Sequence, residues 1–97
     1  MLHTVNKSPF SHNNLESCLS FAKEKDAILL YEDGVLGAQA GSRLESTIKA
    51  ALKKHTICAL KEDLNARGIS KTVGGIKVIG YPDFVDLVAE HKVIPWL

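Results

Sequence analysis

Short runs of consecutive apolar residues alternate along this chain with segments in which apolar residues recur every three or four positions. The first pattern is typical of strands buried on both faces of a parallel sheet, and the second is typical of helices. Strands are therefore predicted at 1–5, 27–31, 56–60, 76–80 and 93–96. Helices are predicted at 13–25, 44–55, 61–68 and 81–91.

Glycine and proline mark several of the predicted boundaries. Gly68 suits the left-handed position that ends a helix, and Pro82 suits the first position of the last helix. Pro95 lies inside the last predicted strand, which indicates that this strand is at a sheet edge. The small residues of "VLGAQAG", 35–41, follow the second strand, and no regular element is predicted for them.

Strands that alternate with helices predict an α/β fold, because parallel strands need a crossover connection. We expect a three-layer α/β/α sandwich with a mostly parallel five-stranded sheet, formed as a single domain over residues 1–97. In such sheets, function gathers at the carboxyl ends of the strands. Acidic pairs follow two of these ends, Glu32 with Asp33 and Glu62 with Asp63.

Composition and charge narrow the function classes. The chain is 45% hydrophobic and 24% charged, with 12 basic and 11 acidic residues, which is typical of a globular domain without a strongly basic face for nucleic acid. No apolar run is long enough for a membrane span or a signal peptide. The two cysteines form neither a disulfide framework nor a C-x-x-C pair, so a cytoplasmic protein with reduced thiols is expected.

Few chemical motifs are present. The acidic pairs could hold Mg²⁺, but Asp33 before Gly34 also suits a turn, and Glu62 and Asp63 suit the first turn of a helix. The glycines match neither a dinucleotide fingerprint nor a P-loop, and the four histidines share no metal-ligand spacing. Hydrolase motifs are also missing. Since the chain contains none of these motifs, no cofactor or metal ion is expected.

The two thiols are the remaining candidates. Cys58 lies within a predicted buried strand and is interpreted as a small core residue. Cys18 falls with Leu15, Leu19 and Ala22 on the apolar stripe of the first helix, in its second turn. This spacing predicts that Cys18 is buried or lies at a contact surface, outside the region where a helix N-terminus favours a thiolate.

Several segments, taken together and in order, resemble the DsrH/TusB family of sulfur-relay subunits. They are "LHTVNKSPF" at the start, "LLYEDGV", "ALKEDLNARGI", "DFVDL" and the final "PWL", so the resemblance runs over Leu2 to Leu97. It implies a DsrE/F-like fold and a place in a heterohexamer with DsrE/TusD-like and DsrF/TusC-like subunits. Such complexes pass persulfide sulfur from a TusA-like donor to a DsrC/TusE-like acceptor, without binding nucleic acid or membrane directly.

The resemblance also bears on the site residues. The main sulfur-carrying cysteine of these complexes belongs to the DsrE/TusD-type subunit, and this chain has no cysteine in the comparable segment, 61–68. The stretch "LESCLSF" looks nearer to the DsrH side, where a cysteine stands in this helix, so Cys18 is a candidate sulfur acceptor. Leu60, Leu64 and Arg67 are candidate contacts to a subunit or carrier protein, although their spacing also suits helix packing.

The sequence leaves three functions open. The first is a largely architectural subunit that serves either 2-thiolation of the tRNA wobble uridine or dissimilatory sulfur oxidation. The second is an autonomous persulfide carrier that uses Cys18. The third is a metal-binding, receiver-like α/β module that uses Glu32, Asp33 and Glu62.

Overall fold

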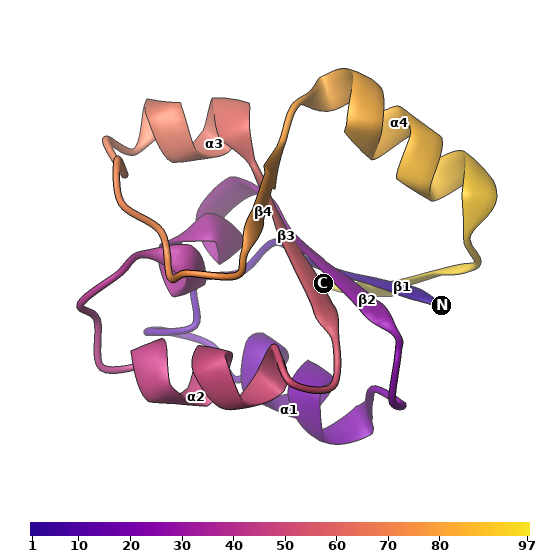
Figure 1. The fold of residues 1–97 in the computed structure, drawn as a ribbon, viewed down its shortest axis with the longest axis horizontal. Coiled ribbons are helices and arrows are strands. Elements are labelled where there is room, and N and C mark those ends of the chain that lie inside the picture. The colour runs from indigo at the N-terminus through magenta and orange to yellow at the C-terminus, as the bar shows by residue number, and fades with distance from the viewer.

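The computed structural model describes residues 1–97, which form one five-stranded sheet with helices on both of its faces (Figure 1). The elements follow in the order β1 (Leu2–Val5), α1 (Asn14–Phe21), β2 (Ala27–Leu30), the 3₁₀ helix η1 (Glu32–Ala38), α2 (Glu45–Ala51), β3 (Thr56–Leu60), α3 (Lys61–Ala66), β4 (Lys77–Ile79), α4 (Tyr81–Glu90) and β5 (Val93–Trp96). This arrangement confirms the predicted α/β class.

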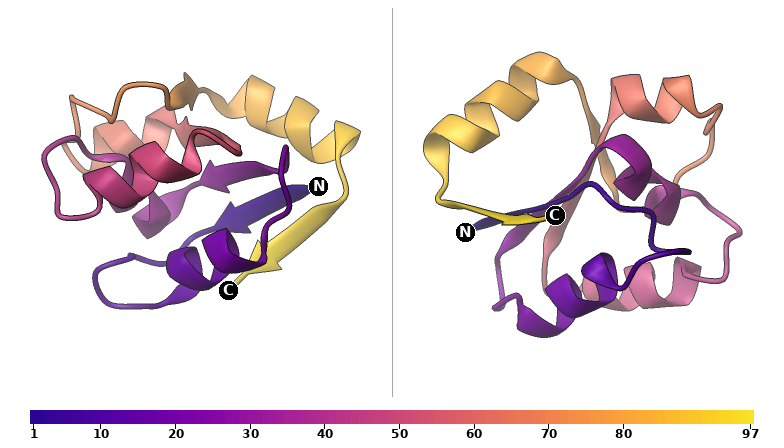
Figure 2. Two further views of the ribbon diagram at one scale, coloured as in Figure 1. Left: turned by 60° about the horizontal axis from the view of Figure 1, so that its bottom comes forward. Right: turned by 180° about the vertical axis from the view of Figure 1, so that it is seen from behind.

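All pairings in the sheet are parallel, and the strand order is β4-β3-β2-β1-β5. The apolar runs of β2 and β3 lie in the middle, where both faces are covered, as their sequences predict. The last strand pairs with the first, Leu2 with Val93 and Val5 with Trp96, so β5 is the edge strand that Pro95 indicates. Figure 2 shows β1 and β5 side by side, with the carboxyl terminus at the end of β5.

The two faces of the sheet are covered unequally. On one face, α1 and α2 bury a cluster of 13 residues that also takes in Leu64 of α3 and Val35 of η1. On the other face, α4 packs Phe84 and Leu87 against a cluster of three buried residues, Leu2, Leu29 and Cys58. Figure 1 shows α4 across the sheet from α1 and α2.

Three expectations about local structure need correction. The helices predicted over 13–25 and 44–55 are shorter, because α1 ends at Phe21 and α2 at Ala51, each followed by turns that lead into the next strand. The segment after β2 is a 3₁₀ helix, since Gly34, Gly37 and Ala38 are small enough to be buried there. Pro82 is the second residue of α4 after the cap residue Gly80, but it still lies in the first turn, where no N–H is needed.

Gly68 takes the left-handed position that the sequence predicts for it. Gly68 has φ +67° directly after α3, as a glycine in the left-handed position after a helix end should.

No helix here combines the length and the apolar character that a bilayer crossing requires.

Candidate functional site

The carboxyl ends of β2 and β3 bring the two acidic pairs together. The Asp63 carboxylate accepts a hydrogen bond from the backbone N–H of Glu32 at 2.6 Å. Arg67 donates from Nε and Nη2 to Asp33 at 3.0 and 2.8 Å, and from Nη1 to the Asp63 carbonyl at 3.3 Å. The carboxylates of Asp33 and Asp63 are therefore bound to guanidinium and backbone groups. Glu62 and Asp63 lie in the first turn of α3, as the helix-start interpretation predicts.

These contacts hold a strained connection between β2 and η1. Glu32 has φ +47°, a left-handed conformation that costs a non-glycine residue free energy. The hydrogen bond from its N–H to Asp63 compensates part of that cost. No three side chains of His, Cys, Asp or Glu are grouped in a way that could hold a metal ion, so the magnesium site that Glu32, Asp33 and Glu62 would form is not present in this geometry.

Glu62 differs from the other members of these pairs because part of its carboxylate is buried without a hydrogen-bond partner. One of its carboxylate oxygens, Oε1, is buried without a hydrogen bond, and a Cβ built on Gly80 would lie 3.5 Å from the other, Oε2. Glu62 therefore lies beside the start of α4, where the helix dipole favours a negative charge.

Cys18 lies on the inner face of α1 and has no exposed surface. Burial, reinforced by the negative charge of Asp26, raises the pKa of its thiol from 9.0 to about 12. The predicted burial is thus confirmed, and at neutral pH the group is a protonated thiol rather than the thiolate that attacks a persulfide. A role for Cys18 in carrying sulfur stays a prediction, and it requires a state in which the thiol is exposed.

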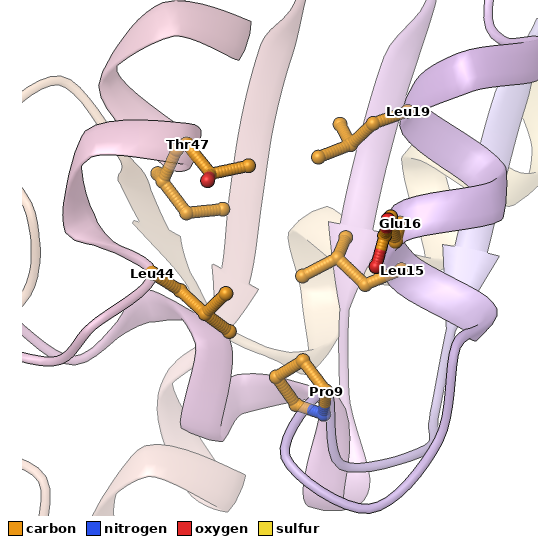
Figure 3. A pocket seen from close by; sticks show the side chains of 7 residues that line it. Pro9, Leu15, Glu16, Leu19, Leu44 and Thr47 are labelled. Atoms are coloured by element: carbon orange, nitrogen blue, oxygen red, sulfur yellow. The ribbon is translucent and has the colours of Figure 1, made fainter.

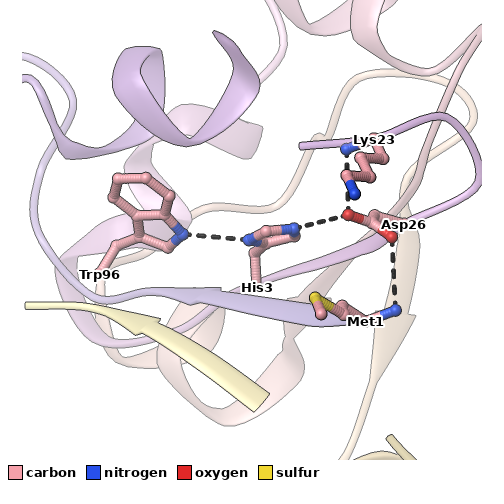
Figure 4. A network of polar contacts seen from close by, with 5 residues as sticks. All are labelled: Met1, His3, Lys23, Asp26 and Trp96. Atoms are coloured by element: carbon pink, nitrogen blue, oxygen red, sulfur yellow. Dashed lines mark hydrogen bonds and ion pairs between the residues drawn. The ribbon is translucent and has the colours of Figure 1, made fainter. Parts of the chain in front are cut away.

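Asp26 belongs to a polar network that the sequence did not reveal (Figure 4). Its Oδ2 lies 2.8 Å from His3 Nε2 and accepts the Lys23 N–H at 3.0 Å, while its Oδ1 lies 3.3 Å from the amino group of Met1. These contacts, the His3 hydrogen bond first, lower the pKa of Asp26 from 3.8 to about 2.

The network continues from His3 to the last strand. The indole N–H of Trp96 donates to His3 Nδ1 at 3.1 Å, and Phe21 packs edge-on against Trp96 with ring centroids 5.7 Å apart. Because an indole nitrogen can only donate, His3 Nδ1 must accept and Nε2 must carry the proton that faces Asp26. His3 is completely buried, yet in the sequence it was only one of four histidines without a shared spacing.

The predicted contact residues Leu60, Leu64 and Arg67 are placed differently from one another. Leu60 ends β3 and Leu64 lies in the main core cluster, with 1% and 3% of their surface exposed. Arg67 is partly exposed and forms the ion pair with Asp33 that links α3 to η1. Of the three, only Arg67 offers a substantial surface to another molecule, and the contact itself stays a prediction.

The structure has four pockets, and two of them have four apolar residues each in their lining. The first, of about 240 Å³, lies between α1 and α2 (Figure 3), with Leu15, Leu19 and Leu44 among its apolar lining and Glu16 at the side of α1. The second, of about 320 Å³, lies between α4 and the sheet and includes Cys58. Burial raises the pKa of the Cys58 thiol, only partly offset by Lys77, so neither cysteine of the chain is poised as a nucleophile.

The family model and the relatives found by sequence indicate the same family. The family model described as "DsrH like protein" matches residues 7–94. A protein named TusB from Enterobacter sp. (strain 638) is 40% identical over 92 residues, which are 94% of each chain. A protein named TusB from Escherichia coli (strain SMS-3-5 / SECEC) is 39% identical over 94 residues, which are 95% of each chain.

Solved structures show the same fold. The crystal structure of the ychN protein from Escherichia coli superposes with a TM-score of 0.79 over 97% of both chains, at 15% sequence identity. A protein from Thermotoga maritima, solved by NMR, gives a TM-score of 0.65 at 25% identity over 94% of both chains.

Proposed function

This chain belongs to the DsrH/TusB family, and from that premise we propose that it is a subunit of a cytoplasmic sulfur-relay complex. The observation that carries the proposal is the similarity to proteins named TusB over nearly the full length of both chains. In this role the chain is mainly architectural, and it positions a sister subunit that carries the persulfide.

The chemistry of the two thiols supports an architectural role. Sulfur transfer needs a reachable thiolate that attacks the outer sulfur of a donor persulfide. Cys18 and Cys58 are both buried, and burial raises the pKa of both thiols. A cysteine on a DsrE/TusD-like subunit would supply the nucleophile, and a DsrF/TusC-like subunit would complete the heterohexamer.

The reaction branch that we favour is 2-thiolation of the tRNA wobble uridine, because the curated relatives described above are named TusB. The complex would then receive sulfur from a TusA-like donor and deliver it to a TusE-like acceptor. Dissimilatory sulfur oxidation with a DsrC-like acceptor is the second candidate, which the cysteine at position 18 favours. In either branch, Cys18 would accept sulfur only in a state that exposes it. Arg67 would contact a neighbouring subunit or carrier, whereas Leu60 and Leu64 are buried within the chain.

Affinity purification of the tagged chain from its native cells, at native expression level, tests this proposal. We expect DsrE/TusD-like and DsrF/TusC-like subunits to be recovered together with a carrier protein, and mass spectrometry identifies the carrier. A TusE-like acceptor together with loss of wobble-uridine thiolation in a deletion strain supports the first branch. A DsrC-like acceptor with normal thiolation supports the second, and recovery of no such subunits contradicts the proposed function.

The role of Cys18 is tested in the same material. The purified complex is loaded with a persulfide donor, and the mass of each subunit is measured for the wild type and for Cys18→Ser. If Cys18 accepts sulfur as a persulfide, the mass of this chain increases by about 32 Da, the mass of one sulfur atom, in the wild type only. Unchanged loading of all subunits in Cys18→Ser contradicts a sulfur-carrying role.

A further inference from the structure

A groove runs between α1 and α2. It consists of the pocket of about 240 Å³ described above and of a further pocket of about 230 Å³, and both pockets have Leu19 and Thr47 in their lining. Figure 3 shows the first of them, with Leu15 and Leu19 on one wall and Leu44 and Thr47 on the other. We call the two pockets together the α1–α2 groove.

The middle of the groove is mainly apolar. Leu15 and Leu19 line it from α1, and Ile48 and Ala51 line it from α2. The exposed Thr47 lies where the two pockets meet, and its hydroxyl group can donate and accept a hydrogen bond. An occupant of the middle would therefore bury apolar side chains and pair a backbone polar group with Thr47.

The two ends of the groove carry opposite charges. Glu16 is the charged residue in the lining of the first pocket, and Lys54 and His55 lie in the lining of the second. Glu16 and Lys54 are exposed, and neither forms an ion pair within the chain. Arg43 lies over the ring of Phe10, 5.2 Å from its centroid, and lines neither pocket. One end is thus acidic, and the other is basic.

The backbone brings further lysines to the basic end. The N–H of Lys25 donates to the carbonyl oxygen of Lys54 at 2.8 Å, so the loop between α1 and β2 lies beside the end of α2. Lys23, Lys25 and Lys53 are exposed and form no ion pair. Glu24 is the exposed carboxylate of this loop, so lysines outnumber it at this end.

His55 adds unused hydrogen-bonding capacity to the basic end. Only 7% of its surface is exposed, and its Nδ1 is buried without a hydrogen-bond partner. Such a buried polar atom costs free energy and is rare in folded proteins. A carboxylate suits this end, because it accepts hydrogen bonds from an imidazole and carries the charge that pairs with Lys54.

The length of the groove indicates the size of its occupant. From Leu44 to Lys54 the chain advances by about 15 Å, at the helical rise of about 1.5 Å per residue. A peptide of about five extended residues spans this distance. A nucleic-acid backbone, which is negative along its whole length, does not suit a groove with Glu16 at one end.

We propose that the α1–α2 groove binds an extended segment of a partner protein, about five residues long. In this segment a lysine or arginine pairs with Glu16, apolar side chains fill the middle, and an aspartate or glutamate pairs with Lys54. Buried apolar side chains supply the affinity, and the two charges fix the direction of the segment. This inference goes beyond the proposed function and does not depend on it.

Titration of the chain with the peptide acetyl-Lys-Leu-Ala-Leu-Glu-amide tests the inference, with amide chemical shifts followed by NMR. We expect saturating shifts that are concentrated in α1 and α2. Glu16→Lys should weaken binding by about fivefold or more, because an attraction between charges becomes a repulsion. Glu90→Lys is the matched control, since Glu90 is an exposed carboxylate of α4, on the other face of the sheet, and it should bind as the wild type does.

An exchange of charges gives a second readout. Glu16→Lys should prefer acetyl-Glu-Leu-Ala-Leu-Glu-amide to the first peptide, which reverses the preference of the wild type. Lys54→Glu should likewise prefer acetyl-Lys-Leu-Ala-Leu-Lys-amide. A variant that fails to fold would lose affinity for every peptide, so a folding defect does not produce a reversed preference.

Each contrary result overturns the inference. If the wild type shows no saturating shifts at millimolar peptide, or only shifts outside α1 and α2, the groove does not bind such a segment. Equal affinities of the wild type and Glu16→Lys for the first peptide would show that the acidic end takes no part. Shifts in α1 and α2 when the chain alone is concentrated would show that a second copy fills the groove. None of these results bears on assembly with sister subunits, which the affinity purification tests.

Discussion

At the scale of single residues, burial rather than residue type decides what the ionisable groups do. Cys18 is the residue whose chemistry is most attractive in the sequence, yet its thiol is enclosed between α1 and the sheet. Asp26 is inconspicuous in the sequence, yet it binds the amino group of Met1, the Lys23 N–H and the buried His3. Burial raises the pKa of the Cys18 thiol, while these three donors lower the pKa of the Asp26 carboxyl group.

The first prediction concerns the reactivity of Cys18. In a Cys58→Ala variant, in which Cys18 is the only thiol, we expect alkylation by iodoacetamide to be at least a hundredfold slower in the folded chain than in urea. The rate should not rise through an inflection between pH 8 and 9, because the pKa of the thiol is about 12. An inflection near pH 8.5, typical of a free cysteine, would contradict the burial of Cys18.

The second prediction concerns the acid sensitivity that Asp26 confers. Its pKa is lowered from 3.8 to about 2 in the folded chain, so its contribution is complete above about pH 5 and is lost as the pH falls towards 2. We expect Asp26→Asn to lower the free energy of unfolding by about 2 kcal/mol at pH 7, a typical value for hydrogen bonds to a charged group. Urea unfolding at a series of pH values should show this difference shrinking below pH 4, and a difference that is constant from pH 7 to pH 2.5 would contradict it.

At the scale of elements, close backbone approach explains the one element that the pattern of apolar residues did not predict. The helix η1 lies against the end of β1, and a Cβ built on Gly34 would be 2.1 Å from the carbonyl oxygen of Val5. Asp63 and Arg67 of the α3 region hold η1 from the other side. The exposed ion pair of Arg67 is worth only about 0–1 kcal/mol, so the steric fit at Gly34 is the dominant constraint.

The third prediction tests that constraint. Gly34→Ala should destabilise the chain by about 3 kcal/mol, because the added methyl group forces β1 and η1 apart. Gly74→Ala is the control, since a Cβ at Gly74 meets no atom within 4 Å and its φ is not positive. It should change the free energy of unfolding by less than about 0.5 kcal/mol. Equal stability of the two variants in urea unfolding would show that η1 does not pack on β1 in this way.

At the scale of the whole molecule, the sheet joins the two ends of the chain. Residues 2–5 pair with residues 93–96, and His3 links Asp26 to Trp96 across that pairing. The C-terminal strand is thus held by a contact between residues 93 positions apart. It is the edge strand, and Pro95, which has no N–H to donate, disfavours the pairing of another strand with it. On the α4 face, this arrangement leaves a single helix to cover the sheet, and that helix keeps an exposed apolar row.

The fourth prediction tests the link between the chain ends. Trp96→Phe keeps an aromatic ring beside Phe21 but removes the N–H that His3 Nδ1 accepts. Leaving that buried nitrogen without a donor should cost about 1–3 kcal/mol of unfolding free energy. Amide exchange should quicken in β5 before it does so in β2 and β3. Unchanged exchange in β5 would show that packing, and not the hydrogen bond, holds the strand.

The pattern of apolar and polar residues determined the strands, the helices and the α/β class, because continuous apolar runs and helical spacing depend only on neighbouring positions. It also predicted that Cys18 is buried or lies at a contact surface, since Leu15, Cys18 and Leu19 share one face of α1, and the structure shows that it is buried. The order of motifs along the chain indicated the family. The tertiary structure alone decided that Asp63 binds the Glu32 N–H, that His3 joins Asp26 to Trp96, and that the acidic side chains of α4 lie beside Cys58 and Lys77. Each of these depends on contacts between residues distant in sequence, whose partners are set by the order and register of the strands rather than by any local pattern.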